Sequence, residues 1–347
     1  MHDPSRRSVV SMLSAAAASV ALTENGLVTP AAAQEGKFVW AATGGAWSEQ
    51  LTSSFVKGTK FAGPTTTQSA QLESIAASKI LSSNGRPEYS ASNHGNAEVA
   101  LLQAGSALQP YDLSTVTNFA DIRDSAKLGT DYAAFCLLIF GLAWNTKEAK
   151  KPTSFMDMWK PEYKGRIGVP AYGYYGMYWL HALNKIMGGT EDDVTPALKV
   201  VSKLVREQQA VMIENSDHTA RLFEQGEIVM GPWWSGRIIR LKEQGQPIGF
   251  EYVPGTLAVG SGFVIPKGAP QPQLANEFIN GTLDPQRQAA FAALTRYPPT
   301  NKKTVLDEKY KDVALPESAE ANFVKLDWAK ISATRAKNLE LWNKEVL

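Results

Sequence analysis

Short apolar runs alternate with amphipathic segments along most of the chain, which is the pattern of strands alternating with helices. The strongest run, residues 136–144, has the length of a strand buried on both faces, well short of the roughly 20 apolar residues that span a membrane. The pattern predicts other strands at residues 36–42, 61–66, 164–169, 211–214, 226–231 and 257–266. It predicts helices at residues 68–82, 97–104, 152–159, 177–187, 197–208, 216–225, 275–279, 284–294 and 319–347. This alternation indicates an α/β fold.

Four of the predicted strands end in loops rich in glycine, aromatic and hydroxyl residues, at residues 43–47, 88–95, 170–176 and 232–237. In open α/β folds, ligands bind at the carboxyl ends of the strands. Glycine lets the backbone approach a ligand, and helix N-termini offer free N–H groups. These loops are therefore candidate ligand contacts, although a plain strand-to-helix turn at 43–47 and packed rim tyrosines at 174 and 175 explain the same residues.

Two segments carry a family resemblance. The first begins at Asn145 and continues through Pro152, Ser154, Phe155, Asp157, Trp159, Pro161, Tyr163, Gly165, Arg166 and Ile167. The second, residues 226–255, joins an apolar strand to a Trp-Ser-Gly-Arg sequence and then to a second strand ending in Pro-Gly. Together they resemble the periplasmic solute-binding proteins of ABC importers, in the group with spermidine/putrescine, thiamine, ferric-ion and phosphonate binders.

The resemblance implies a type II periplasmic binding fold, with two α/β lobes joined by crossover strands around a central cleft. We expect residues 34–137 with 259–305 in the first lobe, and residues 138–258 with 306–347 in the second. The residues expected to contact ligand are Thr43, Gly45, Trp47, Tyr89, Ser92, Asn93, Tyr174, Tyr175, Trp234, Arg237, Ser261 and Tyr297. The expected partners are a small solute and the membrane permease subunits, with the chain itself a monomer.

The chemistry of these residues limits the classes of solute that we expect the protein to bind. Aromatic faces suit cationic or stacked ligands, but polyamine binders grip ammonium groups with carboxylates, and the matching positions here, Ser261 and residues 174–177, hold none. Arg237 favours a ligand with an anionic group, such as an amino acid, opine or phosphonate, unless it forms only a surface ion pair. The alternatives are a polyamine or thiamine binder, and a ferric-ion binder that uses Tyr174 and Tyr175.

The N-terminus resembles an export signal. Arg6 and Arg7 stand in a twin-arginine-like motif, an Ala-rich segment follows, and small residues at 31–33 predict cleavage near Ala33 into the periplasm. An ordinary secretory signal with two arginines is the alternative. Residues 1–33 are therefore excluded from the fold.

Composition and motifs exclude other classes of protein. The chain has 35 basic and 34 acidic residues, a balance that gives no support to nucleic-acid binding. The single cysteine, Cys136, lies in an apolar run and is expected to be a buried small hydrophobe. His94 is expected to be a solvated loop residue. Nucleophile elbows, HExxH, paired Cys/His ligands and P-loops are missing, so we expect no catalytic site, metal or cofactor, and a secreted enzyme is the weaker alternative.

A helix start is predicted at residues 189–193, where Thr190 would cap the helix and the acidic residues after it would favour the positive helix end. We interpret this acidic run as structural and not as a metal site.

Overall fold

The computed structural model describes residues 37–321 and 323–347, with the side chains of Tyr174 and Glu317 outside the description. The predicted export signal therefore lies outside the described residues. Residues 36–347 form one compact unit. Its strands are β1 (Phe38–Ala42), β2 (Thr66–Ala70), β3 (Ala91–Gly95), β4 (Leu108–Gln109), β5 (Ala133–Asn145), β6 (Gly168–Pro170), β7 (Val211–Ile213), β8 (Met230–Trp234), β9 (Ile248–Glu251) and β10 (Leu257–Pro266).

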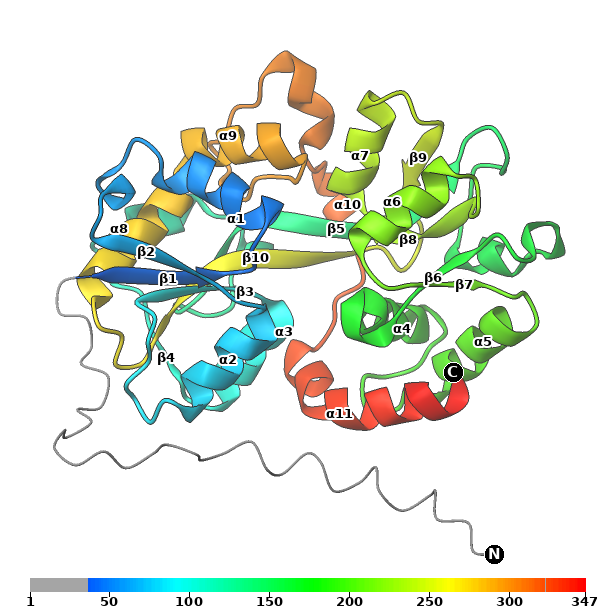
Figure 1. Ribbon diagram of the computed structural model, residues 1–347, viewed down its shortest axis with the longest axis horizontal. Helices are drawn as coiled ribbons and strands as arrows, with labels where there is room; N and C mark the ends of the chain where they lie inside the picture. The colour runs from blue at the N-terminus through cyan, green and yellow to red at the C-terminus, as the bar shows by residue number, and fades with distance from the viewer. Residues whose placement is uncertain (1–36, 322) are drawn as a thin grey trace, which may run out of the picture. The chain divides into compact units, whose positions relative to one another are not determined.

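Helices alternate with these strands, as the sequence predicts for an α/β fold (Figure 1). They are α1 (Ala46–Leu51), α2 (Glu73–Ser82), α3 (Asn96–Ala104), α4 (Met177–Ile186), α5 (Thr195–Arg206), α6 (Ser216–Glu224), α7 (Ser235–Glu243), α8 (Pro272–Thr282), α9 (Pro285–Thr295), α10 (Glu317–Ala321) and α11 (Trp328–Glu345). Two π-helical turns, Thr52–Val56 and Tyr172–Gly176, extend α1 and precede α4.

The two long strands β5 and β10 run antiparallel through the middle of the sheet, whose order is β2-β1-β3-β10-β5-β8. The second half of β10 pairs with β3 on one side and with the first residues of β5 on the other, whereas the last residues of β5 pair with β8 and β9. β5 is buried along both faces, as a run of aromatic and aliphatic residues requires. These two strands therefore connect a β1–β4 half to a β6–β9 half.

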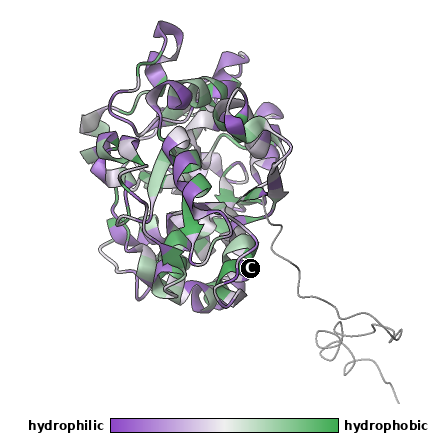
Figure 2. Cartoon of the chain, turned by 90° about the vertical axis from the view of Figure 1, so that its left-hand side faces the viewer, coloured by the Kyte–Doolittle hydropathy of each residue, from purple (hydrophilic) through white to green (hydrophobic). Residues whose placement is uncertain are grey.

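Hydrophobic side chains fill the space between the sheet and the helices on both of its faces, and Figure 2 shows the hydrophilic residues on outward turns of the helices. In the first half, Trp40 and Phe263 from the sheet pack on Phe278 of α8. Cys136 is buried in β5, which confirms its prediction as a core residue.

Several predicted boundaries were wrong. The predicted strand at 61–66 is a 3₁₀ turn, and the second strand is Thr66–Ala70, which pairs with β1 in parallel. Residues 68–70 of this strand had been placed in the helix predicted at 68–82, which begins only at Glu73. The predicted strand at 226–231 lies instead at Met230–Trp234 and runs straight into α7 without a loop.

Three further predictions failed for reasons of tertiary pairing. The expected loop at 88–95 contains strand β3, so His94 is fully buried and not solvated. Thr190 does not cap a helix: it bridges Asp193 in a turn, and α5 begins at Thr195. The C-terminal helix predicted from residue 319 is interrupted, because residues 323–327 form neither helix nor strand and the Val324 amide donates to the Thr256 carbonyl.

Candidate functional site

The turn between β1 and α1 presents Trp47 to the carboxyl end of the neighbouring strand β3. Gly45, just before α1, has φ 71° and ψ −150°, a combination that essentially only glycine adopts. The turn places the Trp47 indole so that Nε1 donates to Asn93 Oδ1 over 3.0 Å. Thr43 and Gly45 remain partly or fully exposed beside it.

Asn93 joins this indole to the crossover strand β10. Its amide nitrogen donates to Ser261 Oγ over 3.1 Å and to the Gly262 carbonyl over 3.0 Å. The antiparallel pairing of β3 with β10 brings these groups together, since Asn93 lies opposite Phe263 and Gly95 lies opposite Ser261. Three separate segments therefore meet through one buried amide.

Tyr297 completes the cluster in the first half. Helix α9 ends at Arg296 in the left-handed conformation, with φ 64°, which turns the chain back towards α1. The Tyr297 ring centroid lies 6.3 Å from that of Trp47. We call Trp47, Asn93, Ser261 and Tyr297 the first-half cluster.

The residues predicted in the second half lie where β8 passes into α7. Trp234 packs against Phe140 and Tyr175, with ring centroids 5.1 and 5.5 Å away. The Tyr175 hydroxyl donates to the Pro232 carbonyl over 3.0 Å, and Tyr175 is fully buried. Tyr175 is thus a packing residue against Trp234. The backbone of Tyr174 belongs to the same π-helical turn, Tyr172–Gly176.

The two groups of predicted residues touch at Gly236. A Cβ atom built on Gly236 would lie 2.8 Å from the Tyr297 ring and 2.6 Å from the Thr295 carbonyl oxygen. Trp234 and Arg237 stand on either side of this contact in the sequence. The Arg237 guanidinium is partly exposed and lies 3.9 Å from the exposed carboxylate of Asp217, too far for a tight ion pair.

Two of the predicted ligand residues lie elsewhere. Tyr89 precedes β3, at the amino end of that strand, and is buried near Lys79 and Glu88. Ser92 is also fully buried and alternates with Asn93 along the strand, so its side chain points to the opposite face of the sheet. The prediction of a loop at 88–95 had treated these residues as neighbours in one surface.

One acidic residue at this edge was missed by the sequence reasoning. Glu73, the first residue of α2, accepts the Gly95 backbone N–H at Oε2 over 2.7 Å. Burial, and after it the negative charge of Glu98, raises the pKa of the Glu73 carboxyl to about 8. The sequence analysis placed Glu73 inside a longer predicted helix. The preference of acidic residues for the first turn of a helix is the one sequence feature that could have identified it as a helix start.

Comparison with known proteins identifies the family. Residues 74–317 match the bacterial extracellular solute-binding protein family. The chain belongs to this family. It is 28% identical over 232 residues to the spermidine/putrescine-binding periplasmic protein of Escherichia coli K12, a match that covers 61% of this chain and 64% of the relative.

Other relatives of this solute-binding protein bind different solutes. It is 27% identical over 208 residues to the gamma-aminobutyric acid-binding protein of Pseudomonas aeruginosa, covering 57% of this chain and 55% of the relative. A crystal structure of an ABC transporter protein from Clostridium perfringens superposes with a TM-score of 0.76 at 20% identity, over 90% of this chain and 100% of the other. These likenesses confirm the predicted two-lobed type II fold.

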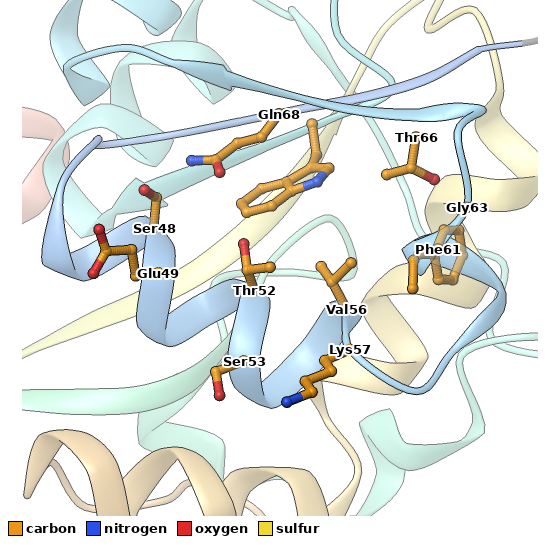
Figure 3. A pocket seen from close by; sticks show the side chains of 12 residues that line it. Ser48, Glu49, Thr52, Ser53, Val56, Lys57, Phe61, Gly63, Thr66 and Gln68 are labelled. Carbon is orange, nitrogen blue, oxygen red and sulfur yellow. The ribbon is translucent and has the colours of Figure 1, made fainter.

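The solute-binding protein also has pockets away from the strand-end cluster. One of about 590 Å³ lies between α1 with its π-helical extension and strand β2, where Ser48, Thr52 and Gln68 point towards one another (Figure 3). Another, of about 540 Å³, lies against the crossover strands at Leu137 and Ala258 and is also lined by residues 320–321, 323–326 and 328. Neither pocket is lined by any predicted ligand residue.

In the part of the chain that the structure describes, none of the helices is both long and apolar enough to cross a membrane. Across residues 37–321 and 323–347, three or more His, Cys, Asp or Glu side chains nowhere gather in a group able to hold a metal ion.

Proposed function

We propose that this chain is the substrate-binding component of an ABC importer and that it holds a small zwitterionic or anionic solute between the two halves of the sheet. The observation that carries the proposal is the contact between the first-half cluster and the Trp234–Arg237 segment at Gly236. Residues from five separate segments converge there, beside the carboxyl ends of β1, β3 and β8, and α/β proteins bind ligands at such strand ends. Family membership makes a solute the expected occupant.

The contacts of the C-terminal region refine the proposed lobes. We keep residues 34–137 with 259–305 in the first lobe and residues 138–258 in the second. Helix α11 packs on α5 and also on α3, and Glu320 pairs with Arg123 of the first half over 2.7 Å. These contacts favour placing residues 306–321 with the first lobe, whereas α11 lies against both lobes, and we keep it with the second.

The anionic end of the solute would bind at the start of α7. This helix presents free backbone N–H groups and the positive end of its dipole. Ser235, its first residue, is buried, and its hydroxyl has no hydrogen-bond partner among the described residues. Arg237 lies two residues after Ser235 in the same helical turn, and its ion pair with Asp217 is weak. Its guanidinium can bind a carboxylate or phosphonate through two hydrogen bonds.

The alternative ligands fit less well. A ferric ion would need Tyr175 as a free oxygen ligand, but its buried hydroxyl donates to Pro232. A polyamine has no anionic group for Arg237. We further propose that the protein acts without catalysis, as a periplasmic monomer whose signal is cleaved near Ala33, with permease subunits and not nucleic acid as its macromolecular partners.

Calorimetry with Arg237→Ala and the matched control Arg240→Ala tests the proposal. Arg240 lies on the same helix but is exposed, so its loss should leave binding unchanged. With 4-aminobutyrate and a small alkylphosphonate as probes, Arg237→Ala should weaken binding at least tenfold. Binding of putrescine by the wild-type protein, with neither anionic probe bound, would refute the proposal. Mass spectrometry of solute retained by native protein then identifies the ligand class.

A further inference from the structure

Glu73 lies on the same side of β3 as the first-half cluster. Asn93 and Gly95 are two residues apart in this strand, so their Cβ directions share one face, about 7 Å apart along the strand. A Cβ atom built on Gly95 would lie 3.4 Å from Glu73 Oε2, 3.5 Å from Val259 Cγ1 and 3.7 Å from the Gly260 carbonyl oxygen. The Glu73 carboxyl therefore lies beside the crossover strand β10, at the position where Ser261 pairs with Gly95 of β3.

A tyrosine of the other half lies within the electrostatic surroundings of this carboxyl. Tyr178, in the first turn of α4, has its pKa raised well above the usual value by burial and then by the negative charges of Glu98 and Glu73. Glu98 is paired, because the Arg335 guanidinium donates to it over 3.0 Å. Among the described residues no Lys, Arg or His side chain forms an ion pair with Glu73, which leaves a carboxyl without a cation at the junction of the halves.

We infer that Glu73 receives the ammonium group of the solute. The inference rests on the proposed function and deepens it: the solute class becomes an amino acid whose amine binds Glu73 while its anionic group binds Arg237. A buried ammonium needs a carboxylate partner. The positions expected to supply one, Ser261 and residues 174–177, hold none, and α2 provides the missing group from a different element.

The charge state of Glu73 makes this inference measurable. Its pKa of about 8 means that most molecules carry the neutral carboxyl at pH 7. An ammonium binds the ionised form, so binding should release close to one proton at pH 7. The charged and titratable groups that face Glu73 are Glu98, Arg335, Tyr178, Tyr132 and Cys136. Both tyrosines and the thiol have raised pKa values and stay neutral between pH 6 and 8.

The experiment is calorimetry of the full chain with 4-aminobutyrate, butyrate and putrescine, in phosphate and in Tris at pH 6, 7 and 8. For wild type with 4-aminobutyrate at pH 7, the measured enthalpies in the two buffers should differ by close to the difference between the ionisation enthalpies of Tris and phosphate. The dissociation constant should fall about tenfold per pH unit up to pH 8. In Glu73→Gln, whose amide oxygen can still accept the Gly95 N–H, affinity for 4-aminobutyrate should drop at least tenfold, with no pH dependence and no proton release.

Controls separate the possible failures. Glu207→Gln removes an exposed carboxylate and should behave as wild type. A single cooperative melting transition at or above the wild-type temperature shows that Glu73→Gln folds. If wild type binds 4-aminobutyrate and Glu73→Gln binds it equally, the role of Glu73 is overturned and the proposed function stands. If wild type binds butyrate but neither amine, the ammonium subsite is likewise overturned. If it binds none of the probes, the proposed solute class fails, and this inference with it.

Discussion

Gly236 and Tyr297 lie in van der Waals contact, so that a Cβ atom on Gly236 would come within 2.8 Å of the tyrosine ring. Gly236 belongs to the first turn of α7, and Tyr297 follows α9, so the contact joins segments from the two halves of the sheet. It also brings Trp234 and Arg237 beside the first-half cluster. This close approach depends on the absence of a side chain at residue 236, and it lies within the proposed solute site.

Replacing Gly236 with alanine should therefore push the two segments apart. The added methyl would also meet the Thr295 carbonyl oxygen at 2.6 Å, and backbone atoms there cannot easily yield. We expect at least a tenfold loss of solute affinity by calorimetry. Gly281→Ala, in helix α8, is the matched control: nothing lies within 4 Å of its Cβ, so it should stabilise the protein by about 0.5–1 kcal/mol. Wild-type affinity in Gly236→Ala would contradict the expectation.

The hydrogen bond between Trp47 and Asn93 should be worth about 1–2 kcal/mol of unfolding free energy. Trp47→Phe keeps an aromatic ring but leaves Asn93 Oδ1 without its donor. Trp144→Phe removes a buried indole N–H that has no partner among the described residues, and its unfolding free energy should change less or rise. Urea denaturation of both variants checks this. Equal losses would show that ring volume, and not the hydrogen bond, sets the effect.

The ion pair between Arg335 and Glu98 should matter more than the exposed ion pairs of the protein. Glu98 is buried, so Arg335→Ala would leave an unpaired carboxylate between α11 and α3 and destabilise the fold by about 2–3 kcal/mol. Lys330→Ala, also on α11, breaks an exposed pair with Asp192 and should cost at most about 1 kcal/mol. Denaturation should also show that Glu98→Gln restores part of the stability of Arg335→Ala.

Acid should destabilise the protein through His94. Burial lowers the pKa of this histidine to about 3, so the unfolded chain binds a proton between pH 6.5 and 3 that the folded chain does not. Stability from the neutral ring is complete above pH 6.5 and falls as the pH drops, by about 3 kcal/mol at pH 4. His94→Leu should flatten this decline in unfolding free energy measured from pH 4 to 7. An unaltered slope would assign acid sensitivity to other groups.

The contribution of Glu73 to the free energy of unfolding changes with pH in the opposite direction to that of His94. Its raised pKa makes the folded state hold a proton from pH 4.5 to about 8, so its contribution to stability is full below pH 4.5 and declines as the pH rises. Glu73→Gln, without ligand, should therefore gain stability relative to wild type as the pH is raised from 5 to 8. A constant difference across that range would contradict the assignment.

The sequence alone determined the fold class and the identity of the crossover strands. The runs that became β5 and β10 are long and predominantly apolar on both alternating faces, which is the pattern of a strand buried on both faces. Helices with strong caps were also predictable, as at Asn215, whose side chain accepts the His218 amide at the start of α6. Trp47 and Trp234 were recognisable as strand-end aromatics from the same local pattern.

Only the tertiary structure decided which polar residues meet. Strand β3 has few apolar residues, and its pairing between β1 and β10 overrode the loop character of its sequence, burying Ser92 and His94. The same pairing sets the register that brings Asn93 to Ser261 and offers the Gly95 amide to Glu73. Local sequence specifies individual helices and strands because the interactions that form them are local. A binding site depends on contacts between segments far apart in the chain, and these contacts are set by strand register and packing.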